Sequence, residues 1–408
     1  MLANFIKYCK DPHLVAKIQQ FFGVDIHYDC VKKSDKNGLL NGCAVQENDK
    51  NKKRNNASLQ SQQKGTMNTD YIKPYTVTNH FWYYLFLFGT ELGDESFYAT
   101  AIPFWFWNID GAVGRRIVLV WATVMAVGQT LKDIICWPRP SCPPAIRFQS
   151  KWELEYGMPS THAMIAVAMP FSTVLFTMNR YIYSFPTGCV AAVIWCTLIC
   201  ISRVYLGMHT VLDIIAGLVL AIVMMIPLVP LVDAMDYYFV TNSWALLLLV
   251  IISLAMIIYY PRSKKWTPTR GDTALVVSVT VGVHVGVWLH YKTGALIKPL
   301  LPPPYHVIWP SYSILGLVIL RTILGYCCIL GTKAVGKSLS YATMCGILQV
   351  NSKELIQSQD SLDNKNKILV DLIYKYITYF TIGFNITYLL PNVFTVLGIE
   401  RPTFYTEL

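Results

Sequence analysis

Long apolar segments alternate with short polar ones along most of this chain, and the alternation predicts its architecture. From Phe81 onward, apolar runs recur that are long enough to cross much of a bilayer as helices. The pattern therefore predicts an all-α fold, a polytopic transmembrane helical bundle with about nine spans. We expect a short interfacial or re-entrant segment at 81–89 and then spans at about 97–107, 117–136, 163–178, 187–201, 211–232, 244–260, 274–290, 312–331 and 376–395.

The first 79 residues follow a different pattern. Within residues 1–32, the run DPHLVAKIQQFFGVDI places apolar side chains at helical spacing, which predicts an amphipathic helix. Such a helix could lie on the membrane surface or pack on the protein's own loops, and the sequence favours neither. Residues 33–79 are predicted to be a polar, disordered insert and linker, with a glycosylation sequon at Asn56. The start lacks the apolar region of a signal peptide, so we expect the first span to direct targeting.

Composition supports a membrane protein. Hydrophobic residues make up 54% of the chain and charged residues 14%, an unusual balance for a soluble domain. The net charge of +10 is spread over the tail and loops, which argues against nucleic acid and favours membrane lipids as neighbours. The eleven cysteines include no C-x2-C pair; Cys136 and Cys142 could form a disulfide in an oxidising compartment, although free thiols are favoured.

Polar groups capable of chemistry gather in three short runs between Lys132 and Asp213. Two apolar segments, 163–178 and 187–201, separate the runs, so the first and last can return to the same face of the membrane. We therefore expect the three runs to meet there. They are KDIICWPRP with Lys132 and Arg139, PSTH with Ser160, Thr161 and His162, and SRVYLGMHTVLD with Arg203, His209 and Asp213.

The three cations in these runs indicate the ligand. Lys132, Arg139 and Arg203 lie at the ends of apolar segments, where a positive charge is unfavourable unless an anion neutralises it. Two guanidinium forks and an ammonium suit the several charged oxygens of a phosphate. The sequence therefore predicts a site for a phosphoryl group.

The two histidines supply the means of breaking a phosphate ester. His209 precedes Asp213 by four residues, so a helix that already includes both would let the carboxylate fix the imidazole tautomer. His162 follows Ser160 at the start of another helix, where backbone N–H groups and a hydroxyl can bind an anion while the imidazole protonates a leaving oxygen. Together these groups favour a phosphomonoesterase.

The combined pattern resembles the type-2 phosphatidic acid phosphatase and vanadium haloperoxidase superfamily. That superfamily has the motifs K-x6-RP, PSGH and SR-x5-H-x3-D, and this chain departs from them only at Thr161, which replaces Gly. The forms PSTHA and CWPRP and the N-terminal DPHLVAKIQQFFG are similar to the sphingosine-1-phosphate phosphatases. One motif alone would be weak evidence, but three in order at membrane edges are specific.

The resemblance implies a role for each residue. His209 would attack phosphorus to form a phosphohistidine, Asp213 would orient it, and His162 would protonate the departing alkoxide and later activate water. Thr161 would contribute its backbone N–H, although Gly allows a closer approach there. No metal or other cofactor is implied, and a cluster with one carboxylate is a poor site for a hard divalent ion. The phosphoryl oxygens would be held by Lys132, Arg139, Ser160 and Arg203.

The resemblance also implies a substrate, a location and a division of the chain. It implies a long-chain base phosphate such as sphingosine 1-phosphate, and an endoplasmic reticulum membrane with the site facing the lumen. Loop charges do not decide the orientation, because 261–272 and Arg115-Arg116 are basic on opposite sides. The oligomeric state is left open. The predicted parts are the amphipathic segment 1–32, the insert and linker 33–79, a catalytic core 80–235 and C-terminal transmembrane helices 236–408.

Two other functions are compatible with parts of this pattern. The same fold could act on another lipid phosphate or on a soluble phosphate monoester. Alternatively, the cations could line a passage in a phosphate or lipid transporter or scramblase. A passage needs positive charge but no oriented nucleophile and acid, so the presence of both histidines favours an enzyme.

The remaining polar residues in apolar surroundings have structural explanations that we favour. The acidic run 91–95 could contact a substrate amine, but a helix cap is the simpler interpretation. Arg321 lies in the middle of an apolar helix, and we expect it to bind a carboxylate or helix-end carbonyls. His284 and His290 are expected to be hydrogen-bonded packing residues.

Overall fold

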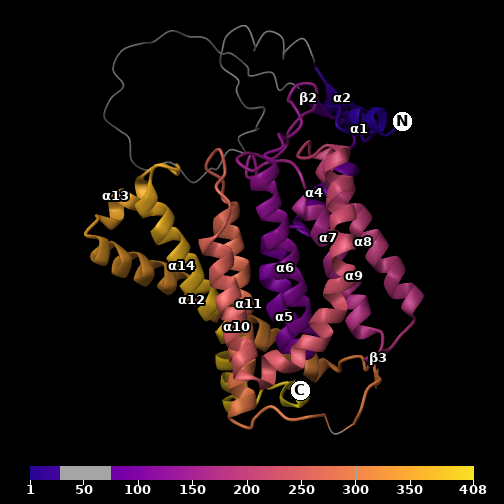
Figure 1. Cartoon of the computed structure of the whole chain (residues 1–408). Helices are drawn as coiled ribbons and strands as arrows, with labels where there is room; N and C mark the ends of the chain where they lie inside the picture. Colours follow the sequence, from indigo (N-terminus) through magenta and orange to yellow (C-terminus); the bar gives the residue numbers. More distant parts are fainter. Residues whose placement is uncertain (28–74, 300) are drawn as a thin grey trace, which may run out of the picture.

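The structure is a computed structural model that describes residues 1–27, 75–299 and 301–408. Residues 33–74 of the predicted insert, including Asn56, lie outside the described residues. The described part is a bundle of long helices, with the N terminus at the upper end and the C terminus at the lower end (Figure 1). Its strands are short: β1 (Val24–Ile26) pairs antiparallel with β2 (Tyr75–Val77), and β3 (Tyr181–Ile182) pairs in parallel with β4 (Tyr305–His306).

Most of the predicted spans are single helices. Five described helices are long and apolar enough to cross a membrane, and two shorter apolar helices accompany them. The all-α membrane fold is therefore confirmed. The five are α6 (Gly111–Ile135), α8 (Phe185–Tyr205), α9 (Val211–Thr241), α11 (Thr269–Lys292) and α12 (Tyr312–Leu348), and the shorter two are α7 (Thr161–Thr177) and α10 (Ser243–Ile258).

The predicted segments 81–89 and 97–107 correspond to two separate helices. They are α4 (His80–Glu91) and α5 (Glu95–Asn108), which follow one another from the upper end to the lower end (Figure 1). The chain breaks between them because Asp94 caps α5, with its carboxylate accepting from the Ser96 N–H at 3.0 Å. The break lies beside the polar site, because Gly93 packs on His162.

The last two spans are longer than their apolar parts. Helix α12 continues to Leu348 rather than ending near 331, because its polar second half remains helical. The short α13 (Ser352–Gln357) leads to α14 (Lys365–Phe384), which continues through the π-helix η1 (Asn385–Leu389) into α15 (Leu390–Val396), and η2 (Phe404–Thr406) ends the chain. Hydropathy identifies the apolar part of a helix, whereas helix-forming polar residues extend it further.

The N-terminal segment packs on the protein itself. It forms α1 (Leu2–Cys9) and α2 (Pro12–Phe21), and Gln19 of α2 is fully buried. The Gln19 amide donates to the carbonyls of Ile146 at 2.6 Å and Tyr205 at 2.8 Å, and its oxygen accepts from the Ile146 N–H at 2.9 Å. Helix α2 therefore packs on the rest of the protein, which is the second of the two arrangements considered for the amphipathic segment.

Burial separates the inner helices from the outer ones. Helices α6 and α11 are mostly buried, whereas α8, α9 and α12 expose many apolar side chains, as expected for surfaces that face lipid. In the interior, α6 packs against α7, α9 and α11, and α7 also packs against α8 and α9. The four helices that carry the predicted site, α6 to α9, thus form one packed unit.

The isolated polar residues have the structural roles expected of them. Arg321 Nε donates to Asn108 Oδ1 at 3.0 Å and its Nη1 to the Ile399 carbonyl at 3.2 Å, so the partners are an amide and a carbonyl rather than a carboxylate. His284 Nδ1 lies 2.8 Å from the Thr280 carbonyl, and the His290 ring packs against aromatic rings near the C terminus. These residues belong to the packing of the bundle.

Candidate active site

The structure brings the three predicted runs together at the upper end of the bundle. Lys132 lies in the last turn of α6, Ser160 caps α7, Arg203 lies in the last turn of α8, and His209 immediately precedes the cap of α9. The loop 259–268 lies at the same end, where Tyr260 donates to Asp133 at 3.1 Å. The prediction that the runs meet on one side is confirmed.

Glu155 connects two of the three cations. The Lys132 ammonium lies 2.5 Å from Glu155 Oε2, and Arg139 Nη2 lies 3.8 Å from the same oxygen. Lys132 also donates to Thr161 Oγ1 at 3.0 Å, so the side chain that replaces the usual Gly helps to hold the lysine. Although burial acts to raise the pKa of the Glu155 carboxyl, Lys132 and Arg139 hold it below its usual value. Glu155 is therefore an ionised partner of the cation cluster.

Arg203 is buried with only part of its hydrogen-bonding capacity used. Its Nη1 donates to Thr90 Oγ1 at 2.7 Å and to Gln149 Oε1 at 3.3 Å. Its Nε and Nη2 are buried without a partner among the described residues. Buried guanidinium donors are normally satisfied, so free donors in a cation cluster are suited to binding an anion.

A tight turn places His209. Gly207 has φ +66°, and an added Cβ would lie 2.0 Å from the Ile146 carbonyl oxygen, so this turn requires glycine. Arg139 Nη1 donates to the Met208 carbonyl at 2.8 Å and lies 3.4 Å from His209 Nε2. Because arginine can only donate, this contact favours the tautomer with a lone pair on Nε2 and the proton on Nδ1.

The relation between His209 and Asp213 differs from the prediction. His209 lies before the helix rather than in it, since Thr210 is the cap of α9. Asp213 Oδ2 accepts the Thr210 N–H at 2.8 Å and is 3.8 Å from His209 Nδ1, too long for a hydrogen bond. The capping box uses one carboxylate oxygen, while Asp213 Oδ1 is buried without a partner in the described part of the chain. The two residues are therefore adjacent without a direct hydrogen bond.

The environment keeps His209 neutral. Burial lowers the pKa of the imidazole well below its usual value, and the neighbouring Arg139, Arg203 and Lys132 lower it further. The side chain is 1% exposed. A neutral, oriented imidazole beside three cations has the protonation state that a nucleophile requires.

The start of α7 determines the positions of His162 and Ser160. The Ser160 hydroxyl accepts the Ala163 N–H at 3.4 Å as the helix cap, and the Ser160 N–H donates to the Asp213 carbonyl at 3.2 Å. The His162 ring packs edge-on against Trp152, with centroids 5.8 Å apart, and its Nε2 is buried without a partner among the described residues. Ser160 thus already serves as a cap, whereas His162 Nε2 remains available.

Several residues of the site were not predicted. Glu155 was missed because nothing in the run WELEYGMPS distinguishes it from the exposed acids of a polar loop. Thr90 and Gln149 were missed because their contacts with Arg203 join segments that are far apart in sequence. One signal could have indicated Glu155: several buried cations require a counter-charge in the free protein. Cys136 has a free thiol that donates to the Asp133 carbonyl, in agreement with the expectation that it forms no disulfide.

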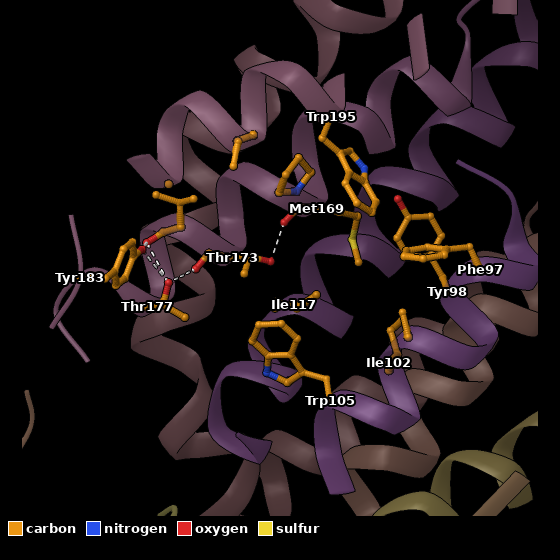
Figure 2. A pocket seen from close by; sticks show the side chains of 17 residues that line it. Phe97, Tyr98, Ile102, Trp105, Ile117, Met169, Thr173, Thr177, Tyr183 and Trp195 are labelled. Carbon is orange, nitrogen blue, oxygen red and sulfur yellow. Dashed lines mark hydrogen bonds between the residues drawn. The ribbon is translucent and has the colours of Figure 1, made fainter. Parts of the chain in front are cut away.

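An apolar cavity of about 440 Å³ lies deeper in the bundle, beyond His162. It opens between α5 on one side and α7 and α8 on the other, with α6 behind (Figure 2). Aromatic rings gather at one end of it, and Thr177 and Tyr183 lie at the other (Figure 2). Tyr98 lines both this cavity and a narrow pocket that contains His162 and Glu155. The cavity and the site pocket are thus neighbours, with the Tyr98 side chain forming a wall between them.

Comparison with known proteins agrees with this geometry. Residues 114–237, which include every predicted site residue, match the PAP2 superfamily. The chain is 39% identical to sphingosine-1-phosphate phosphatase 1 of Rattus norvegicus, over 78% of this chain and 73% of the relative. It is 34% identical to sphingosine-1-phosphate phosphatase 2 of Homo sapiens, over 81% of each, and 27% identical to lipid phosphate phosphatase delta of Arabidopsis thaliana, over 61% and 60%. No solved structure matches the chain.

Proposed function

The chain belongs to the sphingosine-1-phosphate phosphatase family, and on this premise we propose that it hydrolyses the phosphate monoester of sphingosine 1-phosphate and related long-chain base phosphates. The observation that carries the proposal is the convergence of three buried cations and two histidines at one end of a membrane bundle. The cations bind the phosphate, His209 attacks it, and His162 assists release of the alcohol.

In the proposed first step, His209 Nε2 attacks phosphorus. Its proton is held on Nδ1, facing Asp213, so the lone pair of Nε2 is directed towards the cation cluster. The bond to the substrate oxygen breaks as the phosphohistidine forms, and His162 donates a proton to the departing alkoxide. Lys132, Arg139 and Arg203 stabilise the negative charge on the phosphoryl oxygens in the transition state.

In the second step, water replaces the alcohol. His162, which is neutral after giving up its proton, accepts a proton from the water that attacks the phosphohistidine. Phosphate leaves and His209 is regenerated. Ser160 and the Thr161 N–H contribute to the phosphate site from the start of α7, where backbone N–H groups favour an anion.

The apolar cavity supports a lipid substrate. A chain entering from the bilayer between α5 and α8 would place its tail in the cavity and its phosphate beside His162, with headgroup and tail in different surroundings. Each buried methylene contributes roughly 0.8 kcal/mol, so the tail should supply much of the affinity. We place the protein in the endoplasmic reticulum membrane with the site facing the lumen, in agreement with the resemblance noted above.

The test is release of phosphate by the purified protein in detergent from a panel of long-chain base, glycerol-based and soluble phosphates. We expect the long-chain base phosphates to be hydrolysed fastest, and activity to persist with a chelator because the cations provide the electrostatic stabilisation. Release of phosphate where no compartments exist also distinguishes an enzyme from a transporter or scramblase. Absence of hydrolysis of every lipid phosphate by folded protein would refute the proposal.

A further inference from the structure

The start of α5 connects the catalytic groups with the apolar cavity. Gly93, just before the helix, packs on His162, since an added Cβ would lie 3.0 Å from the imidazole Cδ2. Glu95 lines the narrow pocket that contains His162 and Glu155, and Tyr98, almost one turn later, lines both this pocket and the cavity. Glu95 therefore borders the pocket of the reacting groups, and Tyr98 of the same helix borders the apolar cavity as well.

Glu95 differs from Asp94 and Asp272 in having no cation of its own among the described residues. The Asp94 carboxylate binds the Lys151 ammonium at 2.9 Å, and Asp272 binds Lys375 at 3.0 Å. In the part of the chain that the structure describes, neither a hydrogen bond nor an ion pair to the Glu95 carboxylate is found. A carboxylate in a largely apolar pocket without a cation is unfavourable, so this position is suited to a positively charged ligand group.

The surrounding charges point the same way. The Glu95 carboxylate interacts electrostatically with Asp272, Glu155 and Asp94, which are negative, and with Lys375, which already pairs with Asp272. Asp94, Asp272 and Glu155 each have a cation partner, so Glu95 is the carboxylate of this group to which the described residues give no partner. A positive group placed there would pair with the Glu95 carboxylate.

A long-chain base phosphate presents its groups in the matching order. Its phosphate is on the first carbon, an ammonium is on the second, and the hydrocarbon tail follows. From the cation cluster to the cavity, the protein presents positive charge, then Glu95, then apolar and aromatic side chains. Resting on the proposed function, we propose that Glu95 binds the ammonium of the substrate and selects long-chain base phosphates over single-chain lipid phosphates without an amine.

The experiment compares Glu95→Gln with wild type on two substrates of equal chain length, a long-chain base phosphate and an alkyl phosphate without an amine. The variant should lose roughly 10–100-fold in kcat/KM on the first, as expected for a hydrogen bond between charged groups, and less than about threefold on the second. Glu91→Gln is the matched control: it removes the same charge from an exposed side chain at the end of α4, four residues earlier in the sequence, and should leave the ratio unchanged.

Equal losses on both substrates, or a preference unchanged by Glu95→Gln, would overturn the proposal. A second measurement uses only wild-type protein: the free long-chain base should inhibit more strongly than a long-chain alcohol of the same length. Equal inhibition would also overturn it, whether or not the variant folds. If wild type hydrolyses neither phosphate, the proposed function fails instead, so the two failures are distinguishable.

Discussion

The two ends of the bundle differ in whether their buried cations have carboxylate partners. At the lower end, each described arginine outside α12 that is buried or half-buried has a carboxylate partner. At the upper end, Lys132 and Arg139 share Glu155, and Arg203 has donors without partners in the described part of the chain. Matched pairs satisfy each other and support the fold, while surplus cations need a ligand. The lower-end pairs are Arg115–Asp236, Arg116–Asp233, Arg180–Asp110 and Arg401–Glu407.

The comparison teaches that burial of an arginine does not by itself indicate function. Arg115 and Arg203 are equally buried, yet Arg115 Nε lies 3.0 Å from Asp236 Oδ1, and its Nη2 donates to a second carboxylate oxygen and to the Glu407 carbonyl. Among the described residues, Arg203 has two neutral oxygens as its hydrogen-bond partners. The balance of charges around the guanidinium, rather than its depth, separates a structural arginine from a ligand-binding one.

The largest effect should come from the histidine placed among the surplus cations. If the upper end serves chemistry, His209→Ala removes the nucleophile and should lower kcat by at least about 10⁴-fold for every substrate, whatever the leaving group. The measurement is single-turnover release of the alcohol or phenol. His284→Ala is the control, because it removes a buried histidine that lies outside the site. Release of a phenol by His209→Ala at near wild-type rate would show that another group attacks phosphorus.

The second effect separates the two histidines. His162→Ala should slow release of a long-chain alcohol by roughly 10²–10⁴-fold, because an alkoxide needs a proton from a general acid. An aryl phosphate should be affected much less, since phenolate leaves unaided. Single-turnover measurements are needed, because His162 also acts in the hydrolytic step. Equal losses on the two substrates would mean that His162 binds or positions the phosphate rather than protonating the leaving group.

The third prediction compares a buried arginine at each end of the bundle, with activity and stability as the two measurements. Arg203→Gln should lower kcat/KM by roughly 10²–10³-fold with little change in thermal stability, because it removes donors that stabilise the phosphoryl transition state. Arg115→Gln should lower the free energy of unfolding by about 3–5 kcal/mol, since it leaves Asp236 buried without its main partner, while the folded fraction keeps its kcat. If Arg203→Gln instead unfolds the protein and Arg115→Gln inactivates it, the assignment of the two ends is reversed.

Much of this could be predicted from the sequence, and the failures have physical causes. Apolar length and motif spacing predicted the α-helical membrane bundle and the residues that meet at the upper end. The structure differs where local geometry prevails: Thr210 caps α9 and His209 lies before the helix, so Asp213 closes a capping box. Spacing along a helix cannot reveal where the cap falls.

Contacts between segments far apart in the sequence could not be predicted either. The partners of Arg203 come from α4 and from the loop before α7, and Glu155 reaches Lys132 across the same loop. No periodicity connects such segments. The break between α4 and α5, which positions Glu95, depends on the short cap at Asp94 inside a run that is otherwise aromatic and apolar.

The smallest effect concerns the counter-charge at the upper end. Lys132 and Arg139 hold the Glu155 carboxyl in its charged form, so at neutral pH it competes with an anionic ligand for both cations. Glu155→Gln removes this competition and keeps the side chain's size, so vanadate, which mimics the phosphoryl transition state, should inhibit a few-fold more strongly, roughly three- to tenfold. Glu153→Gln is the control, since Glu153 binds Arg147 at 2.9 Å at the edge of the site.

The direction of that change decides what Glu155 does. Stronger inhibition by vanadate means that Glu155 only balances the cations until the ligand replaces it. Weaker inhibition would mean that the carboxylate must hold Lys132 against Thr161 for the phosphate site to keep its shape. In that case the position of Lys132 would matter more than the excess of positive charge. Of the three cations at the upper end, Arg203, which does not pair with Glu155, would then be the one that distinguishes this end from the lower end.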